Sequence, residues 1–118
     1  MDLTVSVYSA TRNFPRDEIF GLSSQLRRAA VSVPSNIAEG KGRLSNGDSL
    51  RFLGNARGSL FEIESQIEIA EKLHYLTAVD AGRLRLSVSE TGKLLNGLIR
   101  SMNADLEPQL RGTPIIER

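Results

Sequence analysis

The sequence predicts an all-α fold, an antiparallel up-down four-helix bundle whose first helix is short. Apolar residues recur at steps of three and four along four separate segments of the 118-residue chain. Cap- and turn-forming residues separate these segments, and no linker is long enough to divide the chain into domains. We therefore expect one bundle domain over residues 1–107. Residues 108–118, which contain Pro108, Gly112 and Pro114, are expected to form a flexible C-terminal tail.

The first two segments meet at Pro15. The residue before a proline avoids the α region, so the first helix should end just before it. The first segment is short, and the alternation of Val5 and Val7 is also compatible with a strand. The second segment should end at Gly40-Lys41-Gly42, a typical helix stop. Apolar positions of the two segments are Leu3, Val7, Ala10 and Phe14, then Ile19, Leu22, Leu26, Ala29, Val33 and Ile37.

The third and fourth segments open with the same capping signal, a hydroxyl residue followed three positions later by an acid. Ser45 precedes Asp48 in this way, and Thr77 precedes Asp80. The third stripe consists of Leu50, Leu53, Ala56, Leu60, Ile63, Ile67, Ala70 and Leu73. The fourth consists of Leu84, Val88, Leu95, Leu98, Met102 and Leu106.

Three residues interrupt the expected helices. Pro34 lacks an N–H and should kink the second helix, leaving the carbonyl of Ala30 without its intrahelical donor. Gly54 and Gly58 stand in the middle of the third helix, where each glycine costs roughly 1 kcal/mol relative to alanine. They favour a close helix–helix approach or a subunit interface over a ligand contact.

The second and third stripes fit each other as an antiparallel hairpin. Five apolar pairs are all centred on the junction of Leu44 and Ser45, between the glycine stop and the serine cap. The pairs are Ile19 with Ala70, Leu22 with Ile67, Leu26 with Ile63, Ala29 with Leu60, and Val33 with Ala56. The same register predicts interhelical ion pairs of Arg28 with Glu62 and Glu64, and of Glu39 with Arg51.

Composition excludes several function classes. The chain has no Cys, which rules out disulfides, thiolate catalysis and Cys-ligated metal sites. Fifteen basic and 14 acidic residues leave a formal charge of +1, far from the basic excess of a typical nucleic-acid-binding domain. No apolar run approaches the ~20 residues of a membrane helix. We expect a cytoplasmic protein without a membrane segment.

Chemistry-bearing motifs are sparse. Glu71-x-x-His74 resembles half of a di-iron carboxylate site, but this is the single His of the chain, and a His at a helix end more often caps carbonyls. Gly40-Lys41-Gly42 lacks the spacing of a phosphate-binding loop. We therefore expect no metal, no cofactor and no enzymatic activity. A solvated or salt-bridged face is the simpler interpretation of the basic residues, and phosphate contact by Arg27, Lys41 and Arg43 is the functional one.

Two blocks of sequence resemble the 23S ribosomal RNA intervening-sequence protein family. The first is residues 25–40 (QLRRAAVSVPSNIAEG), followed by Gly42-Arg43. The second includes Arg51-Phe52-Leu53 and residues 56–60, with Glu62, Glu64 and Gln66. The resemblance covers roughly residues 2–103. Family members usually carry more residues before the position of Asp2, so the resemblance implies a first helix that is truncated at its start.

The resemblance implies an up-down four-helix bundle that assembles into a ring, typically a homopentamer. Related accessory variability proteins of diversity-generating retroelements bind nucleic acid and a reverse transcriptase, so RNA, DNA and such a protein are the expected partners. Those relatives are markedly more basic than this chain. Asn36, Glu39 and Arg57 match the family motif and should form a polar network near Pro34 that supplies a partner for the Ala30 carbonyl.

Together with the features above, the resemblance implies a non-enzymatic subunit of a homo-oligomeric, pentameric ring that acts as a binding or scaffold module for nucleic acid. One alternative is a protein-interaction adaptor that binds no nucleic acid. The other is a metal-dependent enzyme that uses Glu71 and His74.

Overall fold

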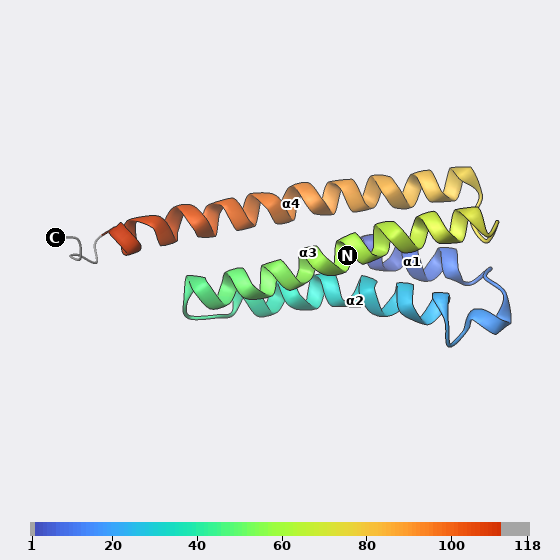
Figure 1. Cartoon of the computed structure of the whole chain (residues 1–118), viewed down its shortest axis with the longest axis horizontal. Helices are drawn as coiled ribbons and strands as arrows, with labels where there is room; N and C mark the ends of the chain where they lie inside the picture. The colour runs from blue at the N-terminus through green and yellow to red at the C-terminus, as the bar shows by residue number, and fades with distance from the viewer. Residues whose placement is uncertain (1, 112–118) are drawn as a thin grey trace.

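The computed structural model describes the backbone of residues 2–111 and the side chains of residues 2–104. The described residues form four α-helices and no β-strand, which confirms the predicted all-α class. The helices are α1 (Asp2–Thr11), α2 (Leu22–Lys41), α3 (Asn46–Lys72) and α4 (Ala78–Arg111), and a 3-10 turn, η1 (Arg16–Glu18), precedes α2. α2 packs on α3, α3 on α4, and α1 on both α2 and α4, as in an up-down bundle (Figure 1).

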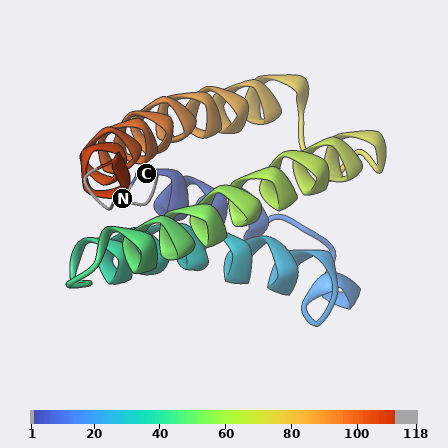
Figure 2. The ribbon, with the colours of Figure 1, turned by 60° about the vertical axis from the view of Figure 1, so that its left-hand side comes forward.

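The bundle is elongated because its helices differ in length. It measures 62 × 23 × 21 Å. α1 has 10 residues, which confirms the short first helix, whereas α4 has 34. α1 therefore covers the end of the bundle near the α3–α4 turn, and the other end consists of α2, α3 and α4 alone (Figures 1 and 2).

A single apolar core runs through the bundle. All four helices contribute to it at the predicted spacing of three and four residues, which places one face of each helix inside. Leu98, Ile99 and Met102 of α4 pack at its edge and are partly buried. The largest side chains with almost no exposed surface are Leu3, Val7, Leu26, Val33, Leu53, Ile63, Ile67 and Leu95.

α2 and α3 form the predicted antiparallel hairpin. Two hydrogen bonds between the helices mark its register. The Ser49 hydroxyl donates to the Gly40 carbonyl at 2.7 Å, and the Ser32 and Ser59 hydroxyls are bonded at 2.8 Å. The predicted register is therefore correct along most of the hairpin. The residues buried between these helices include the predicted partners Leu26, Ala29, Val33, Ala56, Leu60, Ile63 and Ile67.

The start of α2 differs from the prediction, which placed Ile19 in the apolar stripe. Ile19 is 54% exposed, because residues 16–18 turn as η1 and α2 begins only at Leu22. Glu18 explains this start: its Oε1 accepts from the Leu22 N–H and its Oε2 accepts from the Tyr75 hydroxyl, each at 3.0 Å. The bond from Tyr75 to Glu18 raises the pKa of the Tyr75 hydroxyl. Glu18 thus caps α2 and ties it to the α3–α4 turn.

Pro34 lies inside α2, and the helix continues past it. Because proline has no N–H, the carbonyl of Ala30 loses its intrahelical donor. The Thr4 hydroxyl of α1 replaces that donor, with its Oγ1 3.0 Å from the Ala30 oxygen. A break in the hydrogen bonding of one helix thereby becomes the point where another helix attaches.

The α3–α4 turn is closed by His74, which has a left-handed backbone with φ of 63°. The next N–H, that of Tyr75, donates back to the Ala70 carbonyl at 2.9 Å, as in a Schellman motif. The Asp80 N–H then donates to the Thr77 hydroxyl at 3.1 Å, which confirms the predicted cap of α4.

α4 continues to Arg111 and so includes the first residues of the predicted C-terminal tail. The remainder of that predicted tail, residues 112–118, lies outside the described residues. None of the helices that the structure describes carries an apolar stretch long enough to cross a membrane.

Candidate functional site

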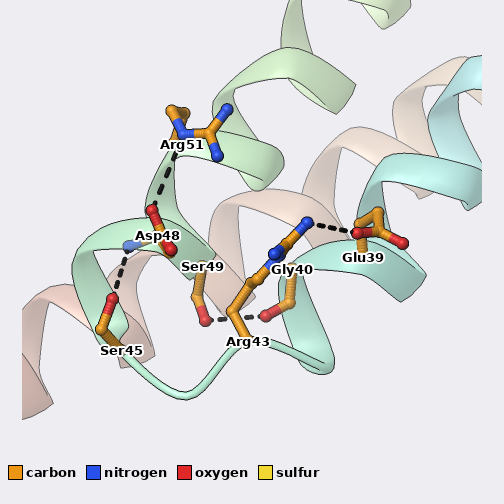
Figure 3. A network of polar contacts seen from close by, with 7 residues as sticks. All are labelled: Glu39, Gly40, Arg43, Ser45, Asp48, Ser49 and Arg51. Carbon is orange, nitrogen blue, oxygen red and sulfur yellow. Dashed lines mark hydrogen bonds and ion pairs between the residues drawn. The ribbon is translucent and has the colours of Figure 1, made fainter.

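The turn between α2 and α3 brings together basic residues that the sequence singles out. We call residues 39–52 the hairpin tip (Figure 3). It contains Lys41 and Arg43, two of the predicted nucleic-acid-binding residues, and Arg51. α2 ends here with Gly42 as its C-cap residue, and the next helix opens with the predicted serine cap.

Gly40 allows the two helices to meet closely at the tip. A Cβ atom at Gly40 would lie 3.1 Å from the carbonyl oxygen of Ser49 and 3.4 Å from the Leu53 side chain. The buried Ser49 hydroxyl in turn donates to the Gly40 carbonyl (Figure 3). At the start of α3, Ser45 Oγ accepts from the Asp48 N–H at 3.1 Å. The tip is therefore a tightly closed, well-capped turn that fixes the positions of the residues on it.

Two arginines share one aromatic ring at the tip. The guanidinium carbons of Arg43 and Arg51 each lie 4.4 Å from the centre of the Phe52 ring. Arg43 also donates to Glu39 at 2.6 Å, and Arg51 lies 3.8 Å from Asp48 (Figure 3). Cation–π contacts of this kind hold guanidinium groups in place without occupying all their N–H donors.

The ion pairs of the tip are exposed to solvent. The side chains of Arg43 and Glu39 retain 38% and 56% of their accessible surface, and those of Arg51 and Asp48 retain 59% and 52%. Exposed pairs contribute only ~0–1 kcal/mol, so an incoming anion can replace the carboxylates at low cost. Lys41 is exposed and forms no ion pair with any described residue. Three cations against two carboxylates leave one excess positive charge on the tip.

Arg27, the third predicted nucleic-acid-binding residue, lies elsewhere. It precedes Lys41 by 14 residues on α2, which is about 20 Å along a helix axis. Its Nε donates to the Thr11 hydroxyl at 2.7 Å, and its guanidinium carbon lies 4.8 Å from the centre of the Tyr8 ring. The structure thus uses Arg27 to hold α1 against α2, and it does not bring Arg27 into the hairpin tip.

The polar network predicted for Asn36, Glu39 and Arg57 is not assembled. Asn36 donates to the carbonyl and hydroxyl of Ser32 at 2.8 and 2.9 Å. Glu39 bonds to an arginine of the tip, and the Arg57 guanidinium lies over the Phe61 ring. The prediction that these residues supply a partner for the freed carbonyl beside Pro34 is wrong, because Thr4 occupies that role.

The predicted interhelical ion pairs are also replaced, because each arginine has a nearer partner on its own helix. Arg28 donates to Ser24 at 3.0 Å, and the tip arginines pair with carboxylates three or four residues away. Within residues 2–104, Glu62 and Glu64 take part in no ion pair. Neighbours on one helix need less side-chain ordering to meet than partners on two helices.

Glu71 and His74, the candidate metal pair, have structural roles. Glu71 accepts from Arg85 at 2.7 Å, which joins α3 to α4. His74 occupies the left-handed position of the α3–α4 turn. Among the described residues, no group of three or more His, Cys, Asp or Glu side chains is placed to hold a metal ion.

Phe52 and Thr4 are functional residues that the sequence did not predict. For Phe52, the available signal was an aromatic residue directly after one arginine and close to another across a short turn. For Thr4, the signal was a polar residue on the helix expected to pack beside the carbonyl that Pro34 frees.

Comparisons with known proteins agree with this architecture. Residues 1–97 match a family model described as "23S rRNA-intervening sequence protein". Among solved structures, the chain is similar to a protein of unknown function from the S23 ribosomal protein family of Bacteroides thetaiotaomicron. The two share 26% sequence identity with a TM-score of 0.71, over 81% of this chain and 87% of that chain. Among curated proteins, none matches the chain.

Proposed function

Because the chain belongs to the 23S rRNA-intervening sequence protein family, we propose that it is a non-enzymatic subunit of a homo-oligomer that binds nucleic acid. The family's name refers to 23S ribosomal RNA, and we propose an RNA strand as the ligand. The observation that carries the proposal is the hairpin tip, where Lys41 is unpaired among the described residues and two guanidinium groups are held over one ring.

The chemistry of the tip suits a phosphate backbone. Guanidinium groups bind phosphate oxygens through parallel N–H donors, and contact with Phe52 fixes their position before the ligand arrives. Lys41 adds a point charge beside them. The carboxylates of Glu39 and Asp48 stay in water on release, because both are already more than half exposed.

Exposed apolar side chains support assembly into a homo-oligomer, for which we propose a pentameric ring. They occur on all four helices, and a subunit interface would bury those that lie within it. In a symmetric ring, each subunit contributes its own tip, so a small excess charge per chain adds up over the assembly. Side chains that are at least two-fifths exposed are Val5, Tyr8, Ile19, Phe20, Val31, Leu44, Phe61, Ile69, Leu73, Val79, Leu86 and Leu94.

Salt dependence of RNA binding tests the proposal. We expect the affinity for a labelled single-stranded RNA to fall steeply with salt, because phosphate contacts release counterions. The double variant Lys41→Ala/Arg43→Ala should bind more weakly, with a salt slope reduced by about one to two units.

The matched control is Lys93→Ala/Arg100→Ala, which removes the same two charge types from exposed positions on α4. It should retain the native affinity and salt slope. Equal losses in both double variants would show that net charge alone drives binding. That result would remove the tip from the proposal.

A protein-interaction adaptor is the second candidate function. Phe20 and Leu44, in the loops on either side of α2, are 94% and 105% exposed. Such apolar side chains suit a protein partner, for example a reverse transcriptase, better than a phosphate backbone.

Absorbance of the purified protein at 260 and 280 nm separates the two candidate functions. Co-purified nucleic acid favours the first, and a stable protein complex free of nucleic acid favours the second.

A further inference from the structure

An open groove of about 230 Å³ lies between α2 and α3, apart from the hairpin tip. Its floor is low because Ala29, Ser32 and Ser59 have short side chains. The longer side chains of Arg28 on α2 and Glu62 on α3 stand on opposite walls. The hairpin register predicted an ion pair between these two residues, and the proposed function does not use the groove.

The opposite charges of the groove do not pair with each other. Arg28 donates to Ser24 on its own helix at 3.0 Å, and Glu62 makes no ion pair with the described residues. One wall therefore offers N–H donors and the other offers a carboxylate acceptor. A ligand that fits must present acceptors on one side and N–H donors on the other.

Polar groups on the floor and at one end add to this requirement. Ser32 accepts from Asn36 at 2.9 Å and is bonded to Ser59 at 2.8 Å, so one of the two hydroxyl hydrogens is left without an acceptor among the described residues. Gln25 also lines the groove, and its Oε1 accepts from the Nε2 of Gln66, which lies outside the lining, at 3.5 Å. Gln66 is 92% buried, and its Oε1 has no donor among the residues that the structure describes.

We propose that this groove binds one unstacked guanine base of a single-stranded nucleic acid, an inference that rests on the proposed function. The Watson–Crick edge of guanine carries two neighbouring N–H groups, which a carboxylate such as that of Glu62 accepts together. Its O6 and N7 atoms are the acceptors that arginine prefers, and Arg28 faces them from the other wall. The undonated serine hydroxyl supplies a further donor from the floor.

Other bases meet this set of groups less well. Adenine places an acceptor where guanine has N1–H, so it would direct a lone pair at the Glu62 carboxylate. Cytosine and uracil are smaller and offer at most one N–H group at that edge. A paired donor–acceptor contact discriminates between bases by about tenfold or more.

Binding of labelled U-rich 12-mer RNAs that carry one central G, A or inosine tests the inference. We expect the G oligomer to bind about tenfold more tightly than the A oligomer, with inosine between them because it lacks one N–H donor. Glu62→Gln should abolish most of this preference while leaving binding of the A oligomer intact. Arg28→Ala should also reduce the preference.

Glu64→Gln is the matched control, since it makes the same substitution two residues further along α3 and outside the groove. It should keep the native preference. Equal binding of the G and A oligomers, or an undiminished preference in Glu62→Gln, would overturn the inference.

Competition by free nucleotides separates the two sources of a guanine base. We expect GMP to displace the G oligomer only at concentrations far above the Kd of the oligomer, because GMP lacks the flanking phosphates. Displacement at an equal concentration would overturn the assignment to a strand. If no RNA binds at all, the proposed function fails, but a direct titration with GMP and AMP still tests the groove. A preference for GMP supports the guanine specificity of the groove. Equal or absent binding of the two nucleotides overturns it.

Discussion

Single residues determine how the helices join at the two turns of the α2–α3–α4 unit. Gly40 lets the backbone of α3 approach α2 at the hairpin tip, and His74 takes a left-handed conformation at the α3–α4 turn. At both positions the residue type is restricted by the backbone geometry, through close approach at Gly40 and a positive φ at His74, and not by a reactive side chain. Gly54 and Gly58 are different, since a Cβ atom there would meet nothing within 4 Å. Close approach within the described chain therefore does not explain them.

Gly40→Ala should destabilise the fold by about 1–3 kcal/mol, because the added methyl group meets the Ser49 carbonyl and the Leu53 side chain. Gly82→Ala provides the control: it is exposed on α4 with nothing within 4 Å, and it should stabilise the helix by up to about 1 kcal/mol. Chemical denaturation of both variants measures the two effects. A neutral Gly40→Ala would show that the tip can move apart without cost.

His74→Gly should raise the free energy of unfolding by about 1 kcal/mol, because glycine adopts the left-handed region without a Cβ penalty. His74→Ala removes the imidazole but keeps the Cβ, and should bring no comparable gain. Thermal unfolding distinguishes the two variants. A loss of stability in His74→Gly would mean that the imidazole itself stabilises the turn.

At the scale of elements, α1 is held to the rest of the bundle by polar contacts as well as by its apolar face. Thr4 bonds the carbonyl freed by Pro34, and Thr11 and Tyr8 hold Arg27. These contacts depend on two helices meeting, so no periodicity within one segment predicts them. The hairpin register was predictable because many apolar pairs and both caps agree on it. Ile19 was mispredicted because Glu18 caps α2 through a contact with the distant Tyr75.

Thr4→Val should destabilise the native protein by about 1–2 kcal/mol, since it leaves the Ala30 carbonyl without a donor. In a Pro34→Ala background, the restored N–H at position 34 can bond that carbonyl, so the same substitution should cost much less. A double-mutant cycle by urea denaturation measures the difference. Equal costs in both backgrounds would contradict the role assigned to Thr4.

Arg27→Ala should destabilise the fold by about 1–2 kcal/mol, because it removes a charged hydrogen bond and a cation–π contact that join α1 to α2. Arg28→Ala should change stability by less than about 0.5 kcal/mol, because Arg28 is exposed and bonds only within α2. If the two substitutions proved equally mild, Arg27 would be free to act as a ligand-binding residue instead.

At the scale of the whole molecule, the near-equal numbers of basic and acidic residues do not exclude a local site for an anion. Several basic side chains pair with acids three or four residues away in the chain, as Arg43 and Arg51 do, and both of these arginines also stack on an aromatic ring. The sequence shows which residues carry charge. It does not show whether an arginine pairs with an acid nearby in the chain or with an acid on another helix, because that depends on side-chain geometry. The hairpin tip is distinguished by one excess positive charge. The electrostatic attraction of this charge for an anion becomes strong only when several subunits assemble and their tips add.

Light scattering of the protein mixed with a single-stranded RNA, with absorbance recorded at 260 and 280 nm across the same chromatographic peak, tests the central proposal most directly. We predict a peak whose protein mass is a multiple of the 12.9 kDa chain mass, five in the case of the proposed ring, and which carries RNA at low salt but not at high salt. A peak of 12.9 kDa that contains no RNA at low salt would contradict it.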